Sequence, residues 1–133
     1  KAREAFNVEI KGAAVRSLDQ NALFHVWCRD VAAYFYNIPA KKVDGDIELE
    51  AIKISLKRQC YNETGWSFIL VTKVDALTGE KAEVLQTTRK YGKGEMFDFM
   101  NWVQVYVSNE PRFGNMILKS TGEYQMLTDS QYT

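Results

Sequence analysis

The stretch RSLDQNALFHVWCRDVAAYFYNI, residues 16–38, is the longest apolar-periodic run of the chain and decides the expected fold. Its apolar side chains recur at spacings of three and four residues, which indicates one buried stripe on a helix of about five turns. The stripe consists of Phe24, Trp27, Cys28, Val31, Phe35 and Ile38. Ser17 and Gln20 have the spacing of a capping box, so we expect the helix to begin at Ser17. Pro39 disfavours helical backbone at the residue before it and supplies the expected end.

The regions on either side of this central helix predict further elements. Residues 5–10 alternate apolar and polar side chains, which predicts a half-buried strand, and residues 11–15 predict a loop. Asp46 is placed to cap a second helix over residues 47–61. The apolar seam of that helix is Leu49, Ile52, Leu56 and Cys60. We expect Cys28 and Cys60 to be buried, reduced thiols of a cytosolic protein.

The second half of the chain predicts a hairpin and a third helix. Residues 66–74 and 82–88 are rich in β-branched and aromatic side chains and are joined by a Gly-containing connection, which favours a β-hairpin. Residues 95–108 predict a helix that ends before Pro111 and Gly114. Its stripe is Met96, Phe99, Met100 and Val103, with Tyr106 or Val107. The expected fold is α+β: a small antiparallel sheet packed by three helices, in the order β-α-α-β-β-α.

Length and charge limit the classes of protein that fit. A chain of 133 residues predicts a single domain, here with residues 111–133 as a loosely packed C-terminal extension. Lys+Arg and Asp+Glu both number 17, so any binding of nucleic acid must depend on basic residues that are gathered locally. No apolar run approaches the length of a membrane span, so we expect no membrane partner and a cytoplasmic location.

Motifs for catalysis are weak. The sequence has neither the Cys-x-x-Cys nor the His-Glu-x-x-His spacing of a zinc site, and no phosphate-binding loop. His25 and Cys28 lie three residues apart on one helix, with Cys28 on the apolar stripe, which argues against a nucleophile pair. We therefore expect no catalysis, no cofactor and no metal. A small magnesium-dependent nuclease stays open as the alternative, with candidate carboxylates at Asp19, Asp30, Asp44, Asp46, Glu48 and Glu50.

Basic and aromatic residues suggest binding of single-stranded nucleic acid, in which cations follow the phosphates and rings stack on bases. The run Arg89-Lys90-Tyr91-Gly92-Lys93 combines both features beside the start of a helix, where free N–H groups favour anions. Lys53 and Lys57 share one face of the second helix, and Arg16 lies at the expected start of the central helix. The alternative interpretation is that the loop is structural and that the lysine face is simply solvated.

Two motifs resemble those of the NinB family of phage recombination proteins, the lambda-type Orf recombination mediators. The first is Arg16-Ser17-Leu18-Asp19-Gln20-Asn21 followed by Trp27 in the same helix. The second runs from Thr87-Thr88-Arg89 to Lys93-Gly94-Glu95-Met96 and is followed by a helix that reaches Tyr106. The similar stretches bracket residues 16–108, with residues 39–86 alignable only by the order of elements, and residues 109–133 show no resemblance.

This resemblance implies a recombination mediator. Such a protein binds single-stranded DNA without strong sequence preference, forms a homodimer, and acts with the host single-stranded-DNA-binding protein to load a recombinase. The DNA-binding residues that we expect are Arg16, Asn21, Lys53, Lys57, Arg89, Lys90, Tyr91 and Lys93. Trp102 and Val105 lie off the main stripe of the third helix and are the expected dimer face.

Overall fold

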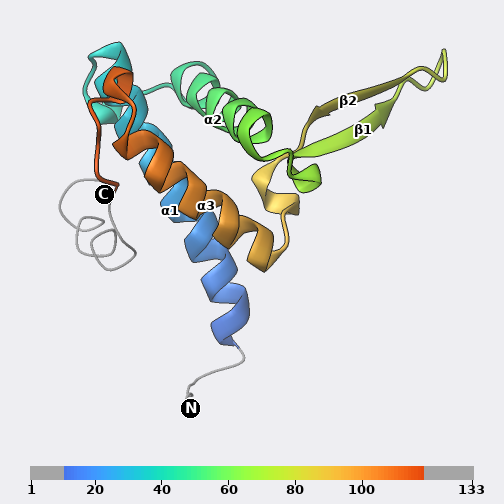
Figure 1. Cartoon of the computed structure of the whole chain (residues 1–133), viewed down its shortest axis with the longest axis horizontal. Coiled ribbons are helices and arrows are strands. Elements are labelled where there is room, and N and C mark those ends of the chain that lie inside the picture. Colours follow the sequence, from blue (N-terminus) through green and yellow to red (C-terminus); the bar gives the residue numbers. More distant parts are fainter. Residues whose placement is uncertain (1–10, 119–133) are drawn as a thin grey trace.

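The computed structural model describes residues 11–118, and their side chains from residue 20 onward. Three helices, α1 (Lys11–Tyr36), α2 (Glu48–Thr64) and α3 (Lys93–Ser108), accompany a hairpin of β1 (Leu70–Val74) and β2 (Lys81–Leu85), as Figure 1 shows. The α+β class is confirmed. The described order is α-α-β-β-α and does not match the expected β-α-α-β-β-α, because the strand predicted at residues 5–10 lies outside the described residues.

Helix α1 begins earlier than the sequence predicted. It starts at Lys11, so residues 11–15 are helical and Ser17 lies inside the helix rather than at its cap; the predicted capping box is wrong. The segment KGAAVR, residues 11–16, contains two alanines and no proline, so nothing in it stops a helix from extending toward the N-terminus. At the other end Asn37 turns into left-handed backbone at φ 57°, and the Ile38 N–H bonds the Ala33 carbonyl at 3.0 Å.

Helix α2 is initiated by Asp44, not by Asp46 as predicted. The Asp44 carboxylate accepts the N–H groups of Asp46 at 2.8 Å and of Ile47 at 3.1 Å. The Glu48 carboxylate accepts the Asp44 N–H at 2.7 Å in return, so the two acidic side chains exchange hydrogen bonds with the backbone at the helix start. The helix ends at Thr64, about one turn later than the expected end at Tyr61. Gly65 follows as the C-cap, and its positive φ of 70° suits glycine.

The predicted hairpin is confirmed, with shorter strands. β1 and β2 pair antiparallel from Leu70 opposite Leu85 to Val74 opposite Lys81. The residues before β1 form a 3₁₀ turn, η2 (Ser67–Ile69), in which Phe68 stacks on Trp66 at 5.6 Å. Figure 1 shows the hairpin projecting away from the three helices, and most of its side chains are exposed.

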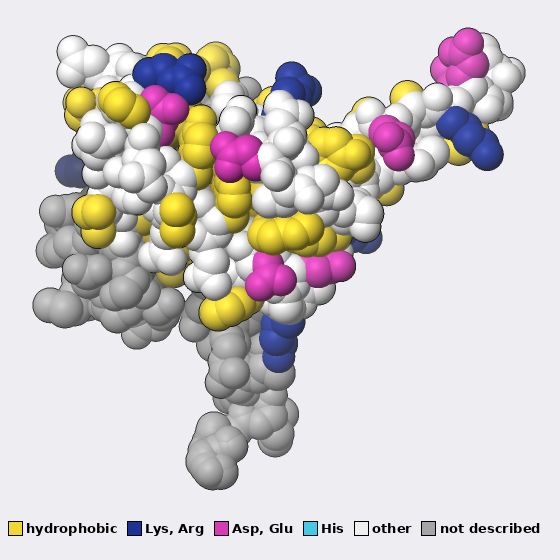
Figure 2. Space-filling view, viewed as in Figure 1, with side chains coloured by type: hydrophobic (Ala, Val, Ile, Leu, Met, Phe, Trp, Pro, Cys, Tyr) yellow, Lys and Arg dark blue, Asp and Glu magenta, His cyan; other side chains and the backbone are white. Residues whose placement is uncertain are grey.

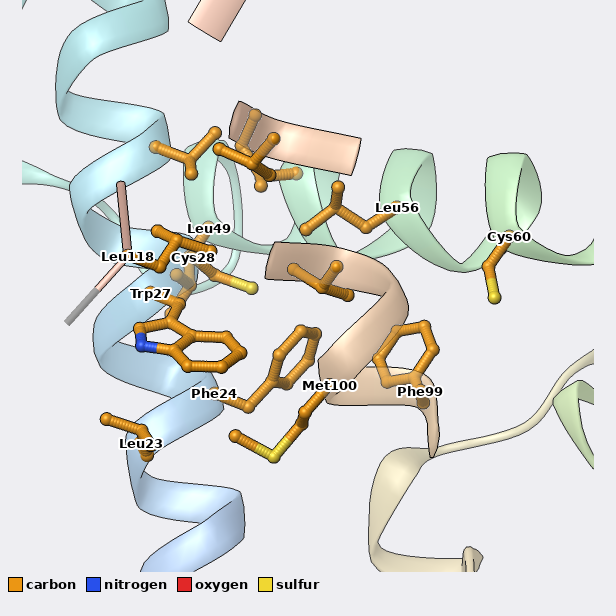
Figure 3. Packing of buried hydrophobic residues seen from close by; sticks show 14 of the residues in the cluster. Leu23, Phe24, Trp27, Cys28, Leu49, Leu56, Cys60, Phe99, Met100 and Leu118 are labelled. Atoms are coloured by element: carbon orange, nitrogen blue, oxygen red, sulfur yellow. The ribbon is translucent and has the colours of Figure 1, made fainter. Parts of the chain in front are cut away.

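The hydrophobic core lies between α1, α2 and α3. Figure 3 shows Phe24 of α1 facing Phe99 and Met100 of α3, and the rings of Phe24 and Phe99 meet edge to face at 5.2 Å. The predicted α3 stripe is confirmed, with Val107 rather than Tyr106 as its last fully buried member. Phe35, the next-to-last residue of the predicted α1 stripe, is instead 47% exposed.

The thiols and the C-terminal part of the described chain also belong to this core. Cys28 and Cys60 are both buried and unpaired, as predicted. Burial raises the pKa of the Cys60 thiol to about 12, which keeps it protonated. After α3 a 3₁₀ turn, η4 (Pro111–Phe113), places Phe113 in the core, and Leu118 is buried too. The chain therefore packs up to residue 118, and no helix in this described part has the length and apolarity needed to cross a membrane.

Candidate nucleic-acid interface

A cluster of basic side chains forms where α1, α2 and a short turn meet. His25 and Arg29 lie four residues apart on α1 and so share one face of that helix. Lys53 reaches across from α2, with its Nζ atom 3.2 Å from Nε2 of His25. Asn21 lies on the same face of α1, one turn before His25. Two predicted site residues, Asn21 and Lys53, are therefore brought together around His25.

The turn η3 (Thr88–Lys90) brings Arg89 to the same place. Thr88 Oγ1 donates a hydrogen bond of 2.9 Å to Asn21 Oδ1, which ties η3 to α1. Arg89 is exposed, and its charge contributes to lowering the pKa of His25. Arg89 makes no ion pair with any residue whose side chain the structure describes. We call His25, Arg29, Lys53 and Arg89 the His25 cluster.

The electrostatics of the cluster are set by burial and by like charges. Partial burial is the largest cause of the lowered pKa of His25, and Lys53, Arg29 and Arg89 lower it further. Glu50 of α2 acts in the opposite direction. The charges of three cations thus act on an imidazole that is neutral at physiological pH, and one carboxylate opposes them. Such an arrangement favours a bound anion.

Arg29 adds a buried guanidinium donor to the cluster. Its Nε atom is buried and has no hydrogen-bond partner within the described part of the chain. A guanidinium N–H that is removed from water without an acceptor is costly, and an oxyanion is its best partner. The Nε–H of Arg29 is therefore a donor that a phosphate oxygen could satisfy.

Lys57, a predicted DNA contact, is used inside the protein. Its side chain is 7% exposed, and Nζ donates to the carbonyl oxygen of Gln86 at 3.2 Å. Burial lowers the pKa of Lys57. The ammonium group holds the end of the hairpin against α2, so the prediction that Lys57 contacts phosphate is wrong for this conformation.

Tyr91 lies in the core and cannot stack on a base. Its ring is 8% exposed and meets Phe68 at 4.9 Å and Phe99 at 5.5 Å, both edge to face. The hydroxyl is buried with no partner among the described residues, and burial raises the pKa of this phenol. The sequence pattern misled because an aromatic between basic residues suits a binding loop and a loop anchored in a core equally well.

The remaining predicted residues are not joined to the cluster by any described contact. Lys90 and Lys93 are exposed, and the side chain of Arg16 lies outside the described part. The N-terminus of α3 has an acceptor of its own, because the Glu95 carboxylate accepts the Gly92 N–H at 2.6 Å. An anion at this helix start would therefore have to compete with Glu95.

His25 and Arg29 were missed by the sequence analysis, which considered His25 only as a partner for Cys28. A usable signal was present: Asn21, His25 and Arg29 recur every four residues, beside the apolar stripe. A polar row of this kind beside a conspicuous apolar stripe is a candidate site once a second helix supplies cations.

Comparison with known proteins gave no match: no family model, no curated protein and no solved structure resembles this chain at a significant level. Among the described side chains, no group of three or more His, Cys, Asp or Glu residues is placed to hold a metal ion.

Proposed function

We propose that this protein binds single-stranded DNA through the His25 cluster and acts as a recombination accessory protein of the NinB type. The observation that carries the proposal is that Lys53 of α2 contacts His25 of α1 at 3.2 Å, while the charges of Arg29 on α1 and Arg89 on η3 also act on this imidazole. Thr88 and Asn21, whose hydrogen bond holds this arrangement, belong one to each of the two motifs that resemble the family.

The charge of the cluster determines how strongly and how specifically it would bind. Phosphate contacts carry no sequence information, so binding through them is independent of sequence. The protein has a net charge of zero, so no diffuse positive field adds to the local contacts. Each phosphate contact on a single strand contributes about −0.7 to the slope of log affinity against log salt, so three cations predict a slope of about −2.

The cellular role follows from the family resemblance. A protein of this kind would not catalyse a reaction; it would act in the host cytoplasm with the host single-stranded-DNA-binding protein and assist loading of a recombinase. The cluster is suited to that role, because a weak and salt-sensitive site can release DNA to a protein that binds it more tightly.

A homodimer is part of the proposal, with a revised interface. Trp102 does not belong to an open face, because it stacks on Tyr106 at 4.8 Å and donates to Glu63 at 3.0 Å. Phe97 and Val105 of α3 are exposed by 58% and 63%, and Figure 2 shows apolar side chains at the surface of the helical body. A hollow of about 240 Å³ between α1 and α3, whose lining includes Phe97 and Trp27, adjoins this face.

Two measurements test the function. Fluorescence anisotropy with a labelled oligothymidylate, with and without magnesium, should give the same salt-sensitive affinity in both cases. A nuclease assay on branched DNA with magnesium should show no cleavage; cleavage would favour the alternative, a small metal-dependent nuclease. Light scattering that finds only monomer for the parent protein at about tens of micromolar would contradict the dimer. The Phe97→Ser variant is expected to be monomeric.

A further inference from the structure

We propose that single-stranded DNA binds at the His25 cluster together with one proton, which His25 takes up from the solvent. This inference rests on the proposed function and adds a form of regulation to the same site. The balance is simple: protein, DNA and one solvent proton give a complex in which His25 is an imidazolium. No bond other than the N–H bond of the imidazole is made.

The contact between Lys53 and His25 defines the protonation state of the His25 imidazole in the free protein. A lysine ammonium group has only donors, so at 3.2 Å the Nε2 atom of His25 must act as the acceptor. The imidazole is then neutral and carries its proton on Nδ1. Protonation of Nε2 would remove this hydrogen bond and place two cations side by side.

The groups whose charges act on His25 come from α1, α2 and η3. Arg29 lies one turn further along α1, Lys53 and Glu50 lie on α2, and Arg89 lies on η3. Three cations therefore oppose the charging of His25, and one carboxylate favours it. In the free protein the neutral form of His25 is therefore favoured.

A bound phosphate reverses this balance. Its negative charge compensates the cations and gives an imidazolium Nε2–H an acceptor, and the Lys53 ammonium can turn to a second phosphate oxygen. The Nε–H of Arg29, one turn along α1 from His25, is a further donor without a partner in the described part of the chain. The imidazole thereby changes from an acceptor for Lys53 into a donor for DNA.

The size of the effect follows from linkage. A shift of about one unit in the pKa of a single group between the free and bound states changes affinity by about tenfold. We expect the affinity for DNA to rise by about that factor as the pH falls from about 7.5 to about 5.5, the range in which histidine titrates.

The experiment uses the whole chain and a short fluorescent oligothymidylate, whose base does not titrate in this range. Anisotropy gives the affinity at each pH. Because His25 is the single histidine of the chain, its ring C–H signals in the NMR spectrum report its pKa with and without DNA. The expected result is tighter binding at low pH together with a higher pKa of His25 in the complex.

The matched variant is His25→Gln, whose amide oxygen can still accept from Lys53 but cannot take up a proton. We expect its affinity to change less than about twofold over the same range.

Parental affinity that does not depend on pH, or an unchanged His25 pKa on binding, would overturn the proton coupling and leave the proposed function standing. Equal pH dependence in parent and variant would also overturn it. No binding at any pH would overturn both proposals. The NMR titration needs no variant, so a poorly folded His25→Gln protein would not prevent a decision.

Discussion

Thr88 Oγ1 lies 2.9 Å from Asn21 Oδ1, and this hydrogen bond joins two segments that are 67 residues apart in the sequence. It links η3, which carries Arg89, to the helix that carries His25 and Arg29. The position of one cation of the cluster relative to the others therefore depends on a neutral pair of side chains.

Removing this hydrogen bond should affect stability and binding together. Thr88→Val keeps the shape of the side chain and removes the donor, so we expect a loss of about 0.5–1.5 kcal/mol in the free energy of unfolding. We also expect weaker binding of DNA, because Arg89 is no longer held near His25. A double-mutant cycle with Asn21→Ala, measured by denaturant unfolding, should show coupling between the two sites. Additive losses would show that the pair does not interact.

Arg89→Ala should weaken DNA binding without destabilising the fold, because the side chain is exposed and has no described ion pair. Losing one of three cations should also reduce the salt slope by about 0.7. Lys41→Ala is the matched control, since Lys41 is an exposed cation on η1 (Ala40–Lys42), beyond the end of α1. Anisotropy and thermal melts on both variants check this. An Arg89→Ala protein that melts earlier but binds as well as the parent would show that the residue is structural.

Two substitutions of Tyr91 test its role in the hydrophobic core. Tyr91→Phe removes a buried hydroxyl that has no described partner, so we expect a protein that is as stable as the parent or up to about 1 kcal/mol more stable. Tyr91→Ala should cost about 3–5 kcal/mol, typical of truncating a buried aromatic. Denaturant unfolding gives both values. A large loss of stability in Tyr91→Phe would mean that the hydroxyl has a partner, such as an ordered water.

Gly114 and Gly94 make a contrasting pair. Gly114 has a φ of +71°, which disfavours any residue with a Cβ, whereas the tip of the exposed Tyr34 ring, 2.6 Å from that Cβ, can move aside, so Gly114→Ala should cost about 1–2 kcal/mol. Gly94 lies in the first turn of α3 with open space around it, so Gly94→Ala should stabilise the protein by about 0.5–1 kcal/mol. Denaturant midpoints measure both. Similar effects in the two variants would contradict the left-handed backbone assigned to Gly114.

The lowered pKa of His25 also predicts how stability depends on pH. The unfolded chain binds a proton near the usual histidine pKa of 6.5, whereas the folded protein binds it only at lower pH. The stability that the neutral His25 contributes to the folded state is therefore complete above pH 6.5. It is lost as the pH falls from there through the pKa of His25 in the folded state. Unfolding of the parent and of His25→Gln across this range measures it. A parent that does not lose stability relative to the variant would contradict the environment assigned to His25.

The sequence predicted the elements of the described fold but not several of their ends. Spacings of three and four residues located all three helices, because a helix must bury one stripe whatever its neighbours are. Capping is less specific: Ser17 has the right spacing but lies inside α1, and Asp44 rather than Asp46 starts α2. A capping pattern shows where a helix could start, and the choice between candidates depends on the segment that precedes it.

The candidate site was only partly accessible from sequence. Asn21, Lys53 and Arg89 were predicted one by one, but their meeting point depends on how α1 and α2 pack and on where η3 docks. The burial of Lys57 in α2 and of Tyr91 after η3 has the same origin, since a local pattern does not reveal which side of a helix or of a short turn another segment will cover. Long-range packing decided each of these cases.

The most direct test of the DNA-binding cluster is chemical-shift mapping of the isotope-labelled protein with an oligothymidylate at low salt. We expect the largest changes on α1 around His25 and Arg29, at Lys53 of α2, and in η3 around Arg89. Saturating DNA that produces no changes there, or changes confined to the projecting hairpin of β1 and β2, would contradict it.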